Sequence, residues 1–518
     1  MKKQPNILFI MVDQLGAATL NCYGGGVDSM PTLDRLASEG TLFSRCYATH
    51  PVCAPNRATM LTGRSSEVHG VVKNNLVLQP DQPTYAQLLQ HAGYRTGGFG
   101  KFHHDPMHLP PPDDYQHLGF DETMVTEDPK LGDWLDWIRR EHPDHYETAL
   151  AVSWPLPWAA SYGSAGEDVL SQIRAARKKI LEPLMQASAW DAMYRSPLPK
   201  ELHQTTFITD TALDFMERHL DEHADRPFFT FVSYVDPHDP YDPPAPYDQL
   251  FYPDDMPTPI PPPDGALPID VLEESRGFRD FRSVSNHVQT MKKFRAFYHG
   301  SLRFIDDQIQ RMVAFLEEKG QVEDTIIVFT SDHGEMLGDH GLITKGVKHY
   351  DAGVRCPLIV KGATGLAPGV HDRLTCSLDF FPTLCDWAGI SVRPPLEGRS
   401  FLEEGHESVL VQAQNEPNGG QALSLVTADG WRLTQYDHPA QTEMFNLNAD
   451  PEELNNLYGM PEVQAQQRRL QEQLVCKMMR RTETVRRSNF PEKNGQRLTF
   501  GSEPWTMVPD GLLSQGSE

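Results

Sequence analysis

The 518-residue sequence predicts an α/β protein with a large, mainly parallel mixed sheet sandwiched by helices and a smaller C-terminal α+β subdomain. Two observations predict the large sheet: short apolar runs suit strands buried on both faces, and segments with helical periodicity lie between them. A third observation places the boundary, because this alternation stops near residue 390. A chain of this length exceeds what one hydrophobic core usually serves. We therefore expect a main domain over residues 1–390 and a subdomain with a tail over residues 391–518.

The elements of the main domain are expected to alternate along the chain. Short buried apolar runs predict strands at residues 6–13, 228–234, 325–331 and 356–362, and residues 96–104 predict a strand that runs into a loop. Apolar residues at helical spacing predict helices between them, at residues 32–40, 84–94, 207–220 and 302–318. Glycine is expected to stop the first two helices, at Gly40 and Gly93.

Residues 120–200 break this pattern and carry five of the eight tryptophans, which are Trp134, Trp137, Trp154, Trp158 and Trp190. The segment is either an α-helical excursion with its own small core or a lid over a pocket, and the sequence favours neither. After residue 390, short strand-like pieces over residues 408–448 precede a helix at residues 462–481. The polar tail after residue 485 either wraps the body or is partly disordered.

The formal net charge of −25 limits the partners of the chain. Nucleic-acid binders need an excess of Lys and Arg, so this class is excluded, and docking on anionic membranes is disfavoured as well. A few local cations are enough to bind a small anionic substrate. The net charge therefore leaves room for such a substrate.

The first residues, MKKQPNILFIMVDQ, superficially resemble an export signal. Their apolar run ILFIMV ends at Asp13 and is too short for a signal-peptide core or a membrane span, so we expect a cytoplasmic protein. The seven cysteines are scattered and contain no C-x-x-C pair, which is not a disulfide framework. Most are expected to be small buried side chains.

Polar side chains follow three of the predicted strands. Asp13 and Gln14 end the first, His238 follows the strand at 228–234, and Asp332 and His333 end the strand at 325–331. In open α/β sheets, ligands bind beyond the carboxyl ends of the strands, so these clusters are expected to converge. Carboxylates with an imidazole or amide suit a divalent cation such as Ca²⁺, Mg²⁺ or Mn²⁺. Taken singly, an Asp at a strand end is more often a helix cap.

Four sequence motifs occur in the order in which one known family has them. The stretch CAPNRATMLTGR (residues 53–64) resembles the sulfatase signature C-x-P-x-R, and GYRTGGFGKFHHD resembles the second signature of that family. TSDHGEMLGDHGLITKG with HYDAGVRCPLIV, and MFNLNADPEELNNL, resemble two further sulfatase segments. The resemblance covers residues 5 to about 475. It implies an alkaline-phosphatase-like fold near the arylsulfatase, phosphonate monoester hydrolase and choline sulfatase branches.

The resemblance implies a modified nucleophile. In sulfatases a separate formylglycine-generating enzyme reads C-x-P-x-R and oxidises the cysteine, here Cys53, to Cα-formylglycine (3-oxoalanine). The hydrated aldehyde attacks the sulfur of a sulfate monoester with one hydroxyl, and its second hydroxyl then expels sulfate. Pro55 and Arg57 satisfy the motif. Asn56 departs from the usual Ser or Thr, a position where the family pattern tolerates variation.

The matched positions also imply a metal site. Asp13, Asp332, His333 and the modified residue 53 are the implied ligands of one divalent cation, with Ca²⁺ favoured over Mg²⁺ or Mn²⁺. Gln14 stands where many sulfatases have a second aspartate, as it does in phosphonate monoester hydrolases and choline sulfatases. Whether Gln14 is a ligand or a hydrogen-bond partner of the substrate stays open.

The remaining matched residues have implied catalytic roles. Arg57 and Lys101 are expected to hold the aldehyde hydrate, and His103 is the implied base for its breakdown. His238 and Lys345 are expected to bind the sulfate group and to assist the departing oxygen.

The leading interpretation is a hydrolase of small-molecule sulfate esters, and two alternatives remain. A phosphonate monoester or phosphodiester hydrolase is favoured by the Asp13–Gln14 pair, whereas Lys101 and His103 within G-K-x-H favour the sulfatase. A protein with unmodified Cys53 would be a catalytically silent binding protein. The substrate and a possible homo-oligomeric state cannot be read from the sequence.

Overall fold

The computed structural model describes residues 4–110, 112, 114–162, 167–188, 193–262, 288–392, 396–414, 420–437, 442–489 and 513–514. Its strands in chain order are β1 Asn6–Val12, β2 Thr41–Phe43, β3 Cys46–Tyr47, β4 Arg95–Gly100, β5 Glu122–Val125, β6 Phe228–Tyr234, β7 Thr325–Ser331, β8 Arg355–Cys356, β9 Leu358–Lys361, β10 Gly369–His371, β11 Thr375–Cys376, β12 Ser391–Val392, β13 Ser408–Gln414, β14 Gln421–Thr427, β15 Trp431–Tyr436, β16 Thr442–Asn446 and β17 Leu513–Ser514. The α-helices are α1 Pro31–Glu39, α2 Cys53–Thr62, α3 Ser66–His69, α4 Tyr85–His91, α5 Asp133–Glu141, α6 Tyr146–Val152, α7 Val169–Ala176, α8 Glu182–Ser188, α9 Gln204–Glu222, α12 Val288–Glu318, α13 Asp351–Val354, α14 Phe380–Trp387 and α15 Gln464–Asn489.

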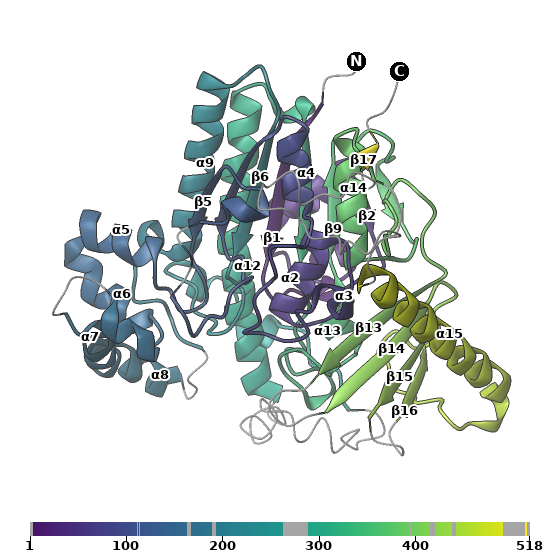
Figure 1. The fold of residues 1–518 in the computed structure, drawn as a ribbon. Helices are drawn as coiled ribbons and strands as arrows, with labels where there is room; N and C mark the ends of the chain where they lie inside the picture. The colour runs from purple at the N-terminus through teal and green to yellow at the C-terminus, as the bar shows by residue number, and fades with distance from the viewer. Residues whose placement is uncertain are drawn as a thin grey trace.

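The central element is a mixed, 8-stranded sheet in the order β10-β2-β9-β7-β1-β6-β4-β5. From β7 to β5 every neighbouring pair is parallel, whereas β9 runs antiparallel to both β7 and β2. Strand β1 therefore lies in the middle, between β6 and β7 (Figure 1). This arrangement brings the ends of three chemistry-bearing strands together at one edge of the sheet.

Strand β1 shows why the sheet is covered on both faces. All of its residues are buried, and successive side chains alternate between two cores. Ile7, Phe9 and Met11 join a core that includes side chains of α2, α4 and α14. The alternate positions, such as Leu8 and Ile10, join a core with α1, α9 and α12. A strand buried on both faces reads as a continuous apolar run, as its sequence does.

Two expected elements differ from the observed ones. The helix predicted at residues 302–318 begins already at Val288, because apolar residues at helical spacing continue upstream through Met291, Phe294 and Tyr298. The strand predicted at 356–362 is interrupted at Pro357, which lacks a backbone N–H. Its first part, β8, pairs with β3, and its second part, β9, joins the large sheet.

The tryptophan-rich segment forms a mostly helical lobe to one side of the sheet, made by α5 to α8 (Figure 1). It has its own core, in which Trp134 is fully buried together with Leu135 and Ile138. Trp137 stacks on Phe207 of α9, with 4.8 Å between the ring centroids. The α-helical excursion with a small core is therefore the better description of its interior, and Trp190 lies outside the described residues.

The C-terminal part contains a four-stranded antiparallel sheet in the order β13-β14-β15-β16. Helix α15 packs on one face through Leu470 and Leu474, and the other face packs against the main body (Figure 1). The division at residue 391 stays a prediction. The tail after residue 485 falls outside the described residues except for the end of α15 and the short strand β17, which pairs with β12. Among the helices of the described residues, none has the length and hydrophobicity needed to cross a bilayer.

Candidate active site

The ends of β1 and β7 place two buried carboxylates side by side. Val12 is paired with Ser331 in the parallel ladder, so Asp13 and Asp332 follow at the same level. Neither carboxylate is exposed, and neither is the imidazole of His333. Two charges can be buried so deeply only when cationic or hydrogen-bonding groups compensate them.

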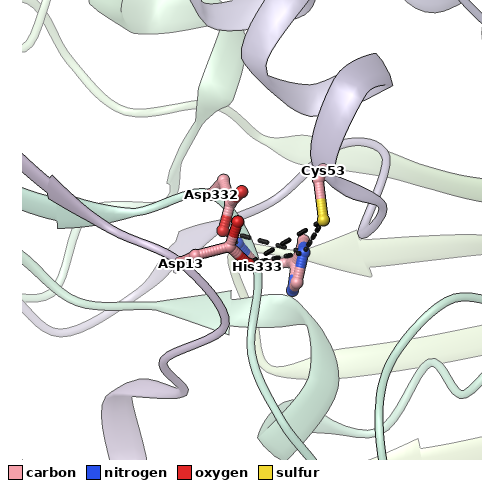
Figure 2. Close-up of side chains that lie close together, drawn as sticks. All are labelled: Asp13, Cys53, Asp332 and His333. Carbon is pink, nitrogen blue, oxygen red and sulfur yellow. Dashed lines mark hydrogen bonds and ion pairs between the residues drawn. The ribbon is translucent and has the colours of Figure 1, made fainter. Parts of the chain in front are cut away.

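Helix α2 directs Cys53 at these carboxylates from its first turn. The Sγ atom of Cys53 lies 3.1 Å from Nε2 of His333 and 3.8 Å from Oδ1 of Asp13 (Figure 2). Every residue of α2 is buried, and Cys53 is 1% exposed. The N-terminus of a helix favours negative charge, so its position suits an anionic group at residue 53.

Arg57, one turn further along α2, joins both strand ends. Its Nε lies 2.7 Å from Oδ2 of Asp332, and a terminal nitrogen lies 3.2 Å from Oδ2 of Asp13. The other terminal nitrogen donates to the carbonyl oxygen of Lys101 at 2.7 Å and to the hydroxyl of Ser233 at 2.8 Å. Burial acts to lower the pKa of Arg57, but the carboxylates of Asp332 and Asp13 outweigh it and raise the pKa. The guanidinium is therefore a fixed, permanently charged clamp.

Lys101 follows β4 and is completely buried. Its Nζ lies 2.6 Å from Oδ2 of Asp13 and 2.7 Å from both carboxylate oxygens of Asp128. Burial acts to lower its pKa, but Asp128 and Asp13 raise it well above the usual range, so the ammonium stays charged. Asp128 is a site residue that we did not predict from the sequence. Asp128 lies shortly after β5, within residues 120–200, where the alternation of apolar runs and helical segments breaks down.

His103, two residues after Lys101, is 1% exposed and has a left-handed backbone with φ of 55°. One oxygen of Glu127 holds this turn, since it accepts the backbone N–H groups of Phe102 at 3.0 Å and of His103 at 2.8 Å. Neither ring nitrogen of His103 has a partner among the described residues. Burial, followed by the charge of Lys101, lowers its pKa well below the usual value. The imidazole is therefore neutral and able to accept a proton.

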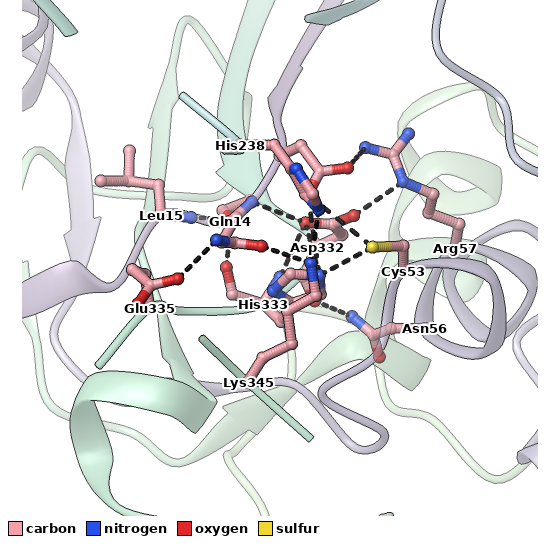
Figure 3. Close-up of polar contacts among 12 residues, drawn as sticks. Gln14, Leu15, Cys53, Asn56, Arg57, His238, Asp332, His333, Glu335 and Lys345 are labelled. Carbon is pink, nitrogen blue, oxygen red and sulfur yellow. Dashed lines mark hydrogen bonds and ion pairs between the residues drawn. The ribbon is translucent and has the colours of Figure 1, made fainter. Parts of the chain in front are cut away.

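Gln14, His238 and Lys345 form a chain of contacts beside the carboxylates (Figure 3). Nζ of Lys345 lies 2.7 Å from Nε2 of His238, and it also donates to Oε1 of Gln14. Nδ1 of His238 lies 2.7 Å from the carbonyl oxygen of Asp239 and donates to it. Burial and the charge of Lys345 act to lower the pKa of His238, but Asp239, Asp128 and Asp13 raise it to about 9. Lys345 and His238 thus both present N–H donors beside the carboxylates, which suits the binding of an anionic group.

Asn56, the departure from the common motif, has a structural task. Its amide nitrogen donates to the backbone carbonyl of Asp332, which helps to hold the end of β7 against α2. Its side-chain oxygen has no partner among the described residues, although Asn56 is fully buried. The shorter side chain of Ser or Thr would not extend as far toward the backbone carbonyl of Asp332.

The donor set of this site fits a divalent cation. One ligand-type atom from each of Asp13, Cys53, Asp332 and His333 lies within 4.8 Å of the others. The two carboxylates are ligands that Mg²⁺, Mn²⁺ and Ca²⁺ prefer, the imidazole of His333 is the softer member of the set, and oxygen in place of the Cys53 sulfur would make the set harder. All ten residues predicted for the site are thereby brought to the carboxyl edge of the sheet, on α2, or in the loops that follow β4, β6 and β7.

A second group of ligand-type side chains lies elsewhere, at Cys376, Asp379 and His406. Hydrogen bonds explain this group, because the oxygens of Asp379 accept from the backbone of Cys376, from the backbone of Arg399 and from Nε2 of His406, each at 2.8 Å. Asp379 thus fastens a turn before α14. We do not count the group as a metal site.

Comparisons with known proteins agree with this geometry. Residues 5–390 match the family model described as Sulfatase, and residues 338–480 match one described as N-sulphoglucosamine sulphohydrolase, C-terminal. The chain is 29% identical over 484 residues to an arylsulfatase of Clostridium perfringens (strain 13 / Type A), which covers 89% of this chain and 91% of that protein. It is 29% identical over 471 residues to a choline-sulfatase of Rhizobium meliloti (strain 1021), with 88% and 83% covered.

Among solved structures, a phosphonate monoester hydrolase from Silicibacter pomeroyi superposes with a TM-score of 0.71 at 26% identity, over 92% of this chain and 96% of that one. Fold, site and sequence together define a hydrolase of the alkaline-phosphatase-like class. The chain belongs to the sulfatase family, and so to a family of sulfuric ester hydrolases. Both the predicted resemblance and the predicted fold class are confirmed.

Proposed function

We propose that this protein hydrolyses sulfate monoesters to an alcohol and inorganic sulfate, with a formylglycine at position 53 as the nucleophile. The observation that carries the proposal is the position of Cys53. It begins a buried helix, lies within the C-x-P-x-R motif, and its Sγ lies 3.1 Å from His333.

Maturation of Cys53 would replace its sulfur by an aldehyde oxygen. This is a two-electron oxidation, carried out by a separate formylglycine-generating enzyme, that releases the sulfur as sulfide. Dioxygen is the oxidant, and it is reduced to the oxidation level of water by these two electrons and by two more from an external thiol. Hydration of the aldehyde then gives a gem-diol with two hydroxyl groups. A serine at this position would leave a sulfate ester that only external water could cleave, whereas a gem-diol carries its own means of release.

Asp13, Asp332, His333 and residue 53 would hold one divalent cation, with Ca²⁺ the first candidate. When bound, this cation supplies positive charge that lowers the pKa of a nearby hydroxyl and offsets the charge of the sulfuryl oxygens. Arg57 pairs with both Asp13 and Asp332, and Lys101 pairs with Asp13, so both carboxylates are held in place. These ion pairs compensate the buried negative charge, so that the carboxylates can remain at the site as ligands.

In the first step, one hydroxyl of the gem-diol loses its proton to water and attacks the sulfur. A new S–O bond forms, the S–O bond to the alcohol breaks, and the departing oxygen keeps the electron pair. Lys345, through its contact with His238, donates a proton to this oxygen, so the alcohol leaves neutral. The sulfuryl group remains on residue 53.

In the second step, His103 takes the proton of the remaining hydroxyl. The carbonyl bond reforms, the bond from carbon to the sulfated oxygen breaks, and sulfate leaves with its electron pair. A neutral, buried imidazole with no other partner among the described residues is suited to this task. Water then hydrates the aldehyde again.

Turnover of p-nitrophenyl sulfate, combined with mass analysis of the peptide that contains residues 53–57, tests the proposal. We expect an aldehyde or its hydrate at position 53 and turnover that stops after treatment with a chelator and returns with Ca²⁺, Mg²⁺ or Mn²⁺. Cys53→Ser is the matched control, since the converting enzyme has no thiol to oxidise there. A fully active preparation with only the thiol at position 53 would contradict the mechanism.

A phosphonate monoester hydrolase is the second candidate. Gln14 after Asp13 and the likeness to the Silicibacter pomeroyi enzyme favour it. Lys101 and His103 favour the sulfatase, because a buried ammonium and a free base suit the sulfated intermediate. A phenyl phosphonate monoester compared with p-nitrophenyl sulfate under identical conditions separates the two, and turnover of the phosphonate alone would reverse our assignment.

A further inference from the structure

The side-chain amide of Gln14 lies between an acid and a base. Its Nε2 donates to Oε2 of Glu335 and lies 3.3 Å from Oδ1 of Asp239, whereas its Oε1 accepts from Nζ of Lys345. Figure 3 shows the nitrogen turned toward Glu335 and the oxygen turned toward Lys345 and the carboxylate cluster. The amide is thus polarised along one direction.

The surroundings permit only this orientation. If the amide were reversed, its oxygen would face the carboxylate of Glu335 and its NH₂ group would face the ammonium of Lys345. Both contacts would then be repulsive, since an acceptor would meet an acceptor and a donor would meet a donor. The assignment of oxygen and nitrogen therefore follows from the charged neighbours.

Glu335 is itself fixed, with 2% of its surface exposed. Its Oε1 accepts the backbone N–H groups of Leu337 at 3.1 Å and of Thr344 at 2.5 Å, so Oε2 points at Gln14. The backbone of Gln14 is fixed as well, because its N–H donates to Oδ1 of Asp332 at 3.1 Å and its carbonyl accepts the hydroxyl of Tyr298 at 2.5 Å. Neither partner has freedom to turn away.

We propose that Glu335 is a positioning residue that turns the carbonyl oxygen of Gln14 toward the metal site, so that Gln14 acts as an acceptor or ligand and not as a donor to the sulfate. This inference rests on the proposed metal-dependent function, and it assigns a task to a residue outside the donor set. It also answers the question that the sequence left open for Gln14. A neutral amide supplies an oxygen here without a third carboxylate charge.

The isosteric change Glu335→Gln tests this directly. The backbone N–H groups of Leu337 and Thr344 still require an oxygen, so the new NH₂ group must face Gln14. Gln14 then has to turn its own oxygen toward residue 335 and its NH₂ group toward the metal site. We expect metal affinity to fall by about 10- to 100-fold, the usual effect of losing a partner that orients a ligand.

The change Gln14→Glu makes residue 14 an acceptor, so that it needs a hydrogen-bond donor at residue 335 in place of an acceptor. With Glu335 present, two carboxylates face each other, whereas Glu335→Gln in that background restores a donor opposite an acceptor. We therefore expect Glu335→Gln to weaken metal binding in the wild-type background and to leave it unchanged or strengthen it in the Gln14→Glu background. A merely electrostatic or structural role of Glu335 predicts the same loss in both.

The measurement is the dissociation constant for Mn²⁺ and for Ca²⁺, determined by titration calorimetry on the full chain with residue 53 converted in every variant and with no substrate present, so that it does not depend on turnover. Glu443→Gln is the matched control, because Glu443 is a buried glutamate that accepts the hydroxyls of Tyr350 and Tyr436. If the single variant Glu335→Gln is too unstable to measure, the metal affinity of the Gln14→Glu variant is compared with that of the double variant, which has a donor at residue 335 opposite an acceptor at residue 14.

Equal losses in the two backgrounds, or no loss in either, would overturn the inference. Wild-type protein that binds neither metal would instead contradict the proposed function, and the positioning role would fall with it. Metal binding by the wild type, together with a loss of affinity on Glu335→Gln in the wild-type background but not in the Gln14→Glu background, supports the proposed function and the positioning role of Glu335.

Discussion

Glu127 offers a quantitative test of how the active-site loop is held. One of its oxygens accepts the N–H groups of Phe102 and His103, and the other is buried with no partner among the described residues. Burial raises the pKa of Glu127 from 4.5 to about 7, although Lys101 acts to lower it. The change Glu127→Gln keeps an oxygen for both N–H groups and removes the buried charge.

The sign and size of the effect follow from the pKa. Because the folded chain keeps a proton on Glu127 that the unfolded chain releases, the contribution of this group is fully present below pH 4.5 and is lost as the pH rises through about 7. One pKa unit corresponds to about 1.4 kcal/mol, so the shift amounts to at most about 3 kcal/mol. Glu127→Gln is expected to match wild type near pH 4.5 and to be more stable by up to about 3 kcal/mol at pH 8.

The assay is guanidinium unfolding of both proteins at several pH values between 4.5 and 8. Glu127→Ala is the control, since it removes the acceptor and leaves two buried N–H groups unpaired, which costs about 1–3 kcal/mol each at every pH. A free-energy difference between Glu127→Gln and wild type that stays constant across this range would refute the reasoning.

Two further predictions concern the residues next to this loop. Asp128→Asn leaves Lys101 with one carboxylate in place of two, and the displaced ammonium is expected to lower kcat by about 100-fold with little change in KM; an unchanged kcat in p-nitrophenyl sulfate turnover would show that Asp128 does not position Lys101. His103→Ala removes the proposed base and is expected to slow turnover by about 10²–10⁴-fold. Intact-mass analysis after mixing with substrate should then reveal a persistent sulfate adduct, and slow turnover without the adduct would place His103 in the first step.

The main sheet could be predicted because its strands are buried on both faces. β1 is almost entirely apolar and β7 has an apolar centre, and polar residues that follow such strands meet at the edge of a parallel sheet. Asp13, Asp332 and His333 were found by that reasoning. The split at Pro357 was not, because the pairing of β8 with β3 depends on a distant part of the chain.

The supporting acids were harder to read from the sequence. Asp128 and Glu127 lie in a tryptophan-rich segment without strand periodicity, so their position at the end of β5 was hidden. Glu335 is the last residue of the D-H-G-E motif, but the sequence did not indicate its role. Its task depends on the direction of an amide and on two backbone N–H groups, which only the folded chain brings together.

The burial of Cys53 determines the order of events in biosynthesis. With 1% of its surface exposed, and with every residue of α2 buried, the folded protein presents no C-x-P-x-R segment that another enzyme could grip. Under the proposed maturation, oxidation must come while the segment is still extended, before β7 delivers Asp332 and His333 almost 280 residues later in synthesis. A chain that folds before it meets its converting enzyme would stay a thiol for its lifetime, so the speed of folding would decide what fraction of the molecules ever becomes active.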